Sequence, residues 1–155
     1  MSSTTTADEL QVVFTFFNEI NIISQLTSNE MARSLPHGLT ISQFSVLNWF
    51  VRVDDEATPG RLARAFQVSK GAMTNTLKQL ARKGFVTVNP DPASGRRKLV
   101  RLTAAGGAAR REAIEATHPA LAAFAAAFDV AEIEALLPTL EAIRSWLDER
   151  RFQDG

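Results

Sequence analysis

The sequence contains no cysteine and no tyrosine, and only two of its 155 residues are histidine. Without cysteine the chain forms no disulfide, offers no thiolate to a metal and senses no oxidant through a thiol, and this usage fits a reducing cytosol. No run of about 18 apolar residues is present, so we expect no membrane span. The segment MSSTTTADEL lacks a basic region followed by an apolar stretch, so we expect no secretory signal and a cytoplasmic location.

Residues suited to catalysis or to metal binding are also scarce. His37 stands at a predicted helix boundary and His118 precedes a proline, and neither has an acid at a spacing typical of a catalytic pair. Two distant histidines without cysteine do not make a strong zinc site. The segment Ser69-Lys70-Gly71 lacks the G-x-x-x-x-G-K-[ST] pattern of a phosphate loop. We therefore expect no enzyme, no cofactor and no metal.

Charge, by contrast, is abundant and unevenly distributed. The chain has 17 basic and 17 acidic residues, but residues 57 to 111 hold twelve of the bases and a single acid, Asp91. This segment carries a net charge of +11, and the remainder carries −11. A basic block of this size suits a polyanion better than a small acidic substrate, and nucleic acid is the obvious candidate. The alternative from charge alone is a solvated basic face without a partner.

Periodicity and punctuation predict a mainly helical chain with one β-hairpin. Apolar spacing predicts a long helix over 7–34, ended by the Pro and Gly of residues 35–38, and a second helix from Thr40, with Phe44, Leu47 and Val51 as its buried stripe. Short helices begin at Thr58 and Ser69, and β-rich runs at 85–88 and 99–102 flank a turn over 89–95. Two further helices follow over 103–128 and from residue 129. Pro119 should kink or split the first, and Pro138 should bend the second.

The helix that begins at Ser69 has two distinct sides. Met73, Leu77 and Leu80 form its buried row, and the opposite side presents polar and basic residues in one stripe. An α-helix fills the DNA major groove, where Asn reads adenine, Lys reads guanine or phosphate, and Thr contacts the thymine methyl group. The predicted DNA-binding residues of this helix are Ser69, Lys70, Gly71, Thr74, Asn75 and Lys78.

The predicted hairpin places consecutive bases at its tip. Ser94 and Gly95 precede Arg96, Arg97 and Lys98. Adjacent like charges repel one another, so stability alone explains them poorly, whereas arginine on a projecting wing can enter the negative minor groove. A cluster that protects a sheet edge is the alternative. The order of a helix, a tight turn, a second helix and a hairpin predicts a winged helix-turn-helix.

The stretch from Thr58 to Gly106, with the upstream segment GLTISQFSVL, resembles the DNA-binding core of MarR-type (multiple-antibiotic-resistance regulator) transcription factors. The most specific pieces are VSKGAMTNTLKQL, KGFV and LTAAG. The long first helix and the two closing helices resemble the dimerisation region of that family. One position departs from the family pattern: its wing commonly has an Asp two residues before the first Arg, an acid understood to orient the wing arginines, and Ser94 stands there.

The resemblance implies a single MarR-like domain over 1–155, with a helical dimerisation region at 7–34 and 107–152 and a DNA-binding lobe at 40–106. It implies a homodimer that binds double-stranded DNA at a palindromic operator, most often as a repressor. It also implies a small aromatic or phenolic effector, bound between the two regions. The residues suggested to contact it are His37, Phe44, Trp49 and Phe50, together with Phe14, although simple core aromatics are the alternative reading.

A second function stays open on the sequence. A winged-helix dimer can also bind nucleic acid without sequence choice, as an architectural protein does. A sequence-specific regulator keeps its site in the presence of excess genomic DNA by a factor of about a thousand or more, and an architectural protein does not.

Overall fold

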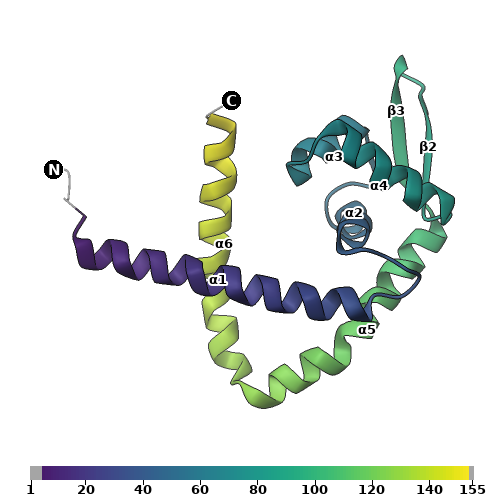
Figure 1. The fold of residues 1–155 in the computed structure, drawn as a ribbon. Coiled ribbons are helices and arrows are strands. Elements are labelled where there is room, and N and C mark those ends of the chain that lie inside the picture. Colours follow the sequence, from purple (N-terminus) through teal and green to yellow (C-terminus); the bar gives the residue numbers. More distant parts are fainter. Residues whose placement is uncertain (1–4, 154–155) are drawn as a thin grey trace. The chain divides into compact units, whose positions relative to one another are not determined.

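The computed structural model describes residues 5–153 and contains six helices and three strands in this range (Figure 1). The fold is mainly helical with a small antiparallel sheet, as the sequence predicts. The elements are α1 (Ala7–Ser34), α2 (Ile41–Arg52), β1 (Glu56–Ala57), α3 (Pro59–Phe66), α4 (Lys70–Arg82), β2 (Val86–Asp91), β3 (Ser94–Leu102), α5 (Ala104–Ala127) and α6 (Val130–Gln153).

Side-chain caps explain where the helices of the lobe formed by residues 40–106 begin. Thr40 and Gln43 form a capping box at the predicted helix start, with each side chain accepting a hydrogen bond from the other residue's backbone N–H. The hydroxyls of Thr58 and Ser69 accept from the third residues of α3 and α4, at 3.2 and 3.1 Å. Between these two helices Gln67 adopts φ 53°, which gives the tight turn of a helix-turn-helix.

The sheet has the strand order β1-β3-β2, and all of its pairs are antiparallel. The sequence did not predict β1, which is only two residues long and pairs with residues 100 and 101 of β3. The hairpin is longer than predicted: the strands continue to Asp91 and resume at Ser94. The basic residues 96–98 therefore belong to β3 and do not form the turn itself. Figure 1 shows the free end of this hairpin projecting past α3 and α4.

One hydrophobic core holds the lobe together. It draws fully buried side chains from α2, α3, α4 and the sheet, among them Leu47, Leu62, Leu80 and Val100. The predicted buried row of α4 is confirmed, because Met73, Leu77 and Leu80 are all buried. The predicted stripe of α2 was partly wrong. Val51 is exposed, and the buried residues of that helix are Gln43, Val46, Leu47 and Phe50.

The start of α5 packs against the hairpin through a glycine. Thr103 caps the helix by accepting from the Gly106 N–H at 3.0 Å, and its own N–H donates to the Phe85 carbonyl at 3.1 Å. Gly106 is buried so close to this carbonyl that an added Cβ would lie 2.0 Å from the oxygen. Only a residue without a side chain fits between α5 and the first residues of the hairpin.

The chain divides into two compact units, residues 1–117 and 118–155. In the first unit α1 has no buried residue along its whole length. In the second unit α6 carries exposed Leu136, Leu140 and Leu147. Helix α5 continues through Pro119, so a split, one of the two outcomes predicted there, does not occur. Helix α6 likewise continues through Pro138. No helix within residues 5–153 is both long enough and apolar enough to span a membrane.

Candidate nucleic-acid interface

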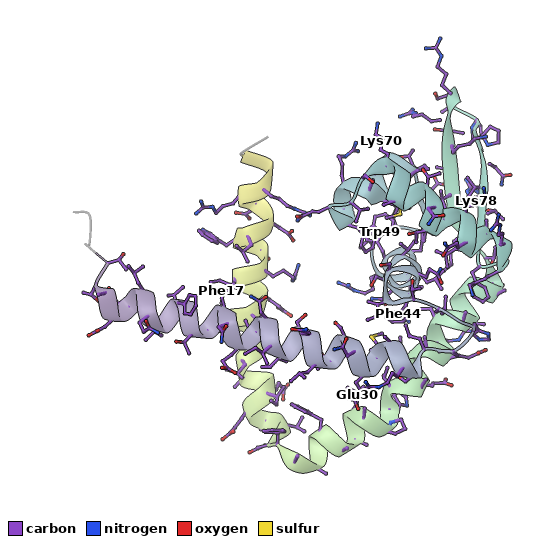
Figure 2. The ribbon with its side chains drawn as sticks, in the orientation of Figure 1. Phe17, Glu30, Phe44, Trp49, Lys70 and Lys78 are labelled. Atoms are coloured by element: carbon purple, nitrogen blue, oxygen red, sulfur yellow. The ribbon has the colours of Figure 1, made fainter. Side chains whose placement is uncertain are left out.

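The predicted reading helix α4 presents its polar stripe to solvent. Ser69, Lys70, Gly71, Thr74, Asn75 and Lys78 are all exposed, while the opposite side of the helix is buried in the core. Figure 2 shows Lys70 near the amino end of α4 and Lys78 two turns further along. An added Cβ at Gly71 would meet nothing within 4 Å, so the helix surface is open there. The side chains that a base edge could meet are therefore available together.

The wing residues Arg96, Arg97 and Lys98 are exposed on β3. The hairpin register is regular from Val86 opposite Leu102 to Pro90 opposite Lys98, and then jumps so that Asp91 stands opposite Ser94. Residues 95–97 therefore have no register partner on β2. A long bulge of this kind redirects side chains away from the flat sheet, and here it carries two of the three bases.

Several acids of the lobe are paired with specific arginines. Asp54 lies 2.5 Å from the Arg61 guanidinium, and Glu56 lies 2.6 Å from that of Arg101. The hydrogen bond from Arg61, followed by a backbone N–H, lowers the pKa of the Asp54 carboxyl. Arg61 also lies over the ring of Trp49 at 5.0 Å. These two arginines are thus committed to the lobe itself, which leaves other cations for a ligand.

A cavity of about 360 Å³ opens between α3, α4 and the wing. Its lining contains four cations from three elements and no acid. The lining residues are Thr58, Pro59, Gly60, Arg64, Lys70, Thr74, Arg97 and Lys98. Four of these, Lys70, Thr74, Arg97 and Lys98, were predicted from the sequence as DNA-binding residues, and the structure brings them to one place.

Sequence reasoning missed the α3 side of this cavity. Thr58 and Pro59 were interpreted only as a helix start, and Arg64 only as part of the basic block. A signal was present, because a helix start with a basic residue about one turn later is suited to an anion. The α3 residues line the cavity only because the tertiary fold places the wing beside them, and the sequence does not show this placement.

The residues suggested for an effector lie in different surroundings. His37, at φ 59° in the turn between α1 and α2, contacts Glu112 of α5, and its carbonyl accepts from Lys83 at 2.6 Å. Phe50 is buried in the core, and Phe44 and Trp49 are half-buried. In Figure 2, Phe44 and Trp49 lie on different sides of α2, which is seen end-on.

Comparison with known proteins agrees with this arrangement. The family model of the MarR family matches residues 37–97, which span α2, the helix-turn-helix and most of the wing. This stretch of the chain is similar to the MarR family. The match covers the basic surface described above except Lys98, which lies one residue beyond its end. No curated relative matches the sequence.

Solved structures resemble nearly the whole chain. A cysteine-to-serine mutant of MarR from E. coli, complexed with operator DNA, is 26% identical with a TM-score of 0.69, over 84% of this chain and 94% of that one. The transcriptional regulator BldR from Sulfolobus solfataricus is 22% identical with a TM-score of 0.74, over 91% and 99%. An organohalide-sensing regulator bound to 2,4-dichlorophenol is 16% identical with a TM-score of 0.71, over 94% and 86%.

Proposed function

We propose that this chain is a sequence-specific regulator of transcription that represses its target genes by binding double-stranded DNA. The observation that carries the proposal is the exposed stripe of α4, which begins at a capped amino end and lies beside a basic wing. Residues near the amino end of a recognition helix reach base edges in the major groove. The E. coli MarR structure holds operator DNA, which supports the same use of the fold here.

The recognition residues are tested by two substitutions on a DNA duplex that the wild type selects from a random-sequence library. Asn75→Ala and Lys70→Ala should each weaken binding to that duplex by about 1–3 kcal/mol, because each removes one base or phosphate contact. The matched control is Ser42→Ala, at an exposed helical serine in α2 that lies outside α4, the wing and the segments proposed for dimerisation. If both lobe variants bind like the control, α4 does not read the DNA.

Salt dependence measures the electrostatic share of binding. Neutralising about 6–10 phosphates per dimer should make the logarithm of the affinity fall with the logarithm of salt at a slope of about −5 to −9. A slope shallower than about −2 would contradict DNA as the partner. Competition with excess genomic DNA distinguishes a sequence-specific regulator from an architectural protein. The competitor displaces an architectural protein from the selected duplex, whereas a regulator stays bound to it.

We propose further that the chain acts as a homodimer on a palindromic site, through helical segments 7–34 and 107–152, while 40–106 binds the DNA. The support is the apolar surface of α1, where eight large apolar side chains are exposed among the described residues. Monomeric proteins rarely expose so much contiguous apolar surface. Phe17 in α1 (Figure 2) and Leu140 in α6 are 38% and 39% exposed.

A charge placed in this surface tests the dimer. Phe17→Asp or Leu140→Asp should give a monomer or an aggregate in sedimentation, with loss of DNA binding, because an unpaired buried charge is costly. Ser42→Ala again serves as the control, because it lies outside both segments. A wild type that is monomeric at micromolar concentration would contradict the dimer.

We also propose that a small aromatic or phenolic effector binds the protein and releases it from DNA. The protein would act in the cytoplasm, where its target DNA lies. The effector is supported by the related regulator bound to 2,4-dichlorophenol. The contact residues proposed are His37, Phe44, Trp49 and Phe50. Titration with 2,4-dichlorophenol should quench the fluorescence of Trp49 and lower DNA affinity, and Phe44→Ala should weaken both effects. If DNA affinity stays unchanged up to the solubility limit of 2,4-dichlorophenol, this compound is not an effector of the protein.

A further inference from the structure

The cavity between α3, α4 and the wing has the chemistry of an anion site. Arg64 comes from α3, Lys70 from α4, and Arg97 and Lys98 from β3, and no acid is among the lining residues. Four exposed cations that line one small volume create a local positive potential, which attracts an anion. The volume, about 360 Å³, is that of a small ligand-binding cavity.

The backbone at the start of α3 adds a donor to this site. The first four N–H groups of a helix have no acceptor within the helix. In α3, Pro59 has no N–H, and the N–H groups of Arg61 and Leu62 donate to the hydroxyl and carbonyl of Thr58 at 3.2 and 3.1 Å. The remaining one belongs to Gly60, which lines the cavity. A Cβ at Gly60 would meet nothing within 4 Å, so no neighbouring side chain covers the backbone at this residue.

An acid from the other strand lies beside Arg97. The Asp91 carboxylate uses one oxygen, Oδ1, to accept the Ala93 N–H of the hairpin turn at 2.9 Å. Its second oxygen, Oδ2, lies 3.8 Å from Nε of Arg97. The Asp91 side chain is 14% exposed and that of Arg97 is 63% exposed, so the acid is largely covered while the arginine remains accessible to a ligand. Ser94 stands where the family commonly has its wing Asp, and its neutral hydroxyl offers no charge to an arginine.

We propose that this cavity receives one phosphate group of the DNA backbone, and that Asp91 is a positioning residue that keeps Arg97 directed at that phosphate. The inference rests on the proposed function and names a contact within it. It also separates the two wing arginines. Arg97 lines the cavity, whereas Arg96 is not among its lining residues and stays available for the minor groove. The acid on β2 thus takes the place of an acid at position 94.

The direction in which one substitution changes DNA affinity tests the role of Asp91. Asp91→Asn keeps the acceptor for the Ala93 N–H and removes only the negative charge. If charge alone mattered, loss of an acid near DNA would tighten binding. If Asp91 orients Arg97, binding should weaken by about two- to fivefold, the range of an exposed ion pair. The same change in an Arg97→Gln background should then have no further effect.

The control is Asp55→Asn, which removes an exposed acid of the same lobe. It should leave binding unchanged or slightly tighter. Tighter binding of Asp91→Asn, equal to that of the control, would overturn the positioning role. A persistent loss in the Arg97→Gln background would overturn it as well, because Asp91 would then act through the turn and not through Arg97.

The phosphate itself is located by ethylation interference on the duplex selected by the wild type. Ethylation of one phosphate in each half-site should impair binding of the wild type, and this interference should disappear in Arg97→Gln and in Arg64→Gln. Each variant should also make the salt slope shallower by about one for each phosphate that it no longer neutralises. Interference patterns identical in wild type and variants would overturn the proposal.

A free phosphate is the other source of the same chemistry. If sodium phosphate raises the melting temperature of the wild type more than sodium chloride of equal ionic strength, and not that of Arg97→Gln, while the interference pattern is unchanged, the cavity holds a free anion and the DNA contact is rejected. A wild type that enriches no sequence would reject the proposed function, and this inference with it. Enrichment with an unaltered pattern would reject the inference alone.

Discussion

Two adjacent glycines at the start of α5 should respond in opposite directions to the same substitution. A Cβ at Gly106 would lie 2.0 Å from the Phe85 carbonyl oxygen and 2.9 Å from the carbonyl carbon. Both atoms are backbone, and the same oxygen accepts the Thr103 N–H, so the strand and the helix must move apart. At Gly107 the nearest atoms are ends of flexible side chains, at 3.8 and 3.9 Å.

The magnitudes follow from three contributions. Overpacking costs about 1–3 kcal/mol, here at the upper end, and the strained hydrogen bond costs about 1 kcal/mol more. Alanine gains up to about 1 kcal/mol over glycine in a helix. Gly106→Ala should therefore lower the free energy of unfolding by about 2–4 kcal/mol, whereas Gly107→Ala should raise it by about 0.5–1 kcal/mol.

Urea unfolding followed by circular dichroism at one fixed protein concentration measures both variants, since dimerisation would make stability depend on concentration. Because both substitutions lie next to each other in the same helix, the two variants differ little in helix position, and both are measured in the same solvent. A Gly106→Ala protein as stable as the wild type would refute the reasoning, because it would mean that α5 does not approach the Phe85 carbonyl so closely.

Three further outcomes concern the lobe. Leu47→Ala, in the centre of the core, should lower the free energy of unfolding by about 2–5 kcal/mol in the same urea assay. Asn48→Ala should cost about 1.5–3 kcal/mol, because Asn48 Oδ1 accepts two hydrogen bonds from Arg110, at 3.0 and 3.1 Å, and a normal stability would show that water replaces it. Asp54→Asn should destabilise at neutral pH and not in strong acid. The Arg61 partner lowers the folded-state pKa of Asp54, so the stabilisation is present above the unfolded pKa of about 3.9 and is lost as the pH falls through the folded value. A stability difference that does not change with pH would contradict this pairing.

Features that depend on neighbouring residues were predictable from the sequence. The caps at Thr40, Thr58 and Ser69 and the buried row of α4 follow from local patterns, and the structure confirms them. The stripe of α2 was harder because apolar residues occur around most of its circumference. Val51 was assigned to the core in place of Phe50, since only tertiary packing decides which side is covered.

Long-range pairing accounts for what the sequence did not reveal. Strand β1 has two residues and no periodicity of its own, and it exists because β3 offers a partner to Glu56 and Ala57. Pro90 indicated a turn, yet it lies within β2, which is an edge strand, where a residue without an N–H is tolerated. The pairing of Asp91 with Arg97 depends on the jump in register and could not be read from spacing alone.

The jump in the hairpin register has a consequence for amide hydrogen exchange. At the base of the wing, residues 99–102 of β3 pair in order with β2, whereas residues 95–97 have no partner there. Exchange reports local opening, so one strand should contain two protection levels, slow at its base and fast in the bulge. When DNA fixes the bulge, the amides of residues 95–97 should slow strongly while those of 99–102 change little. Exchange measured with and without the selected duplex would thus follow the ordering of the wing separately from the stability of the sheet that carries it.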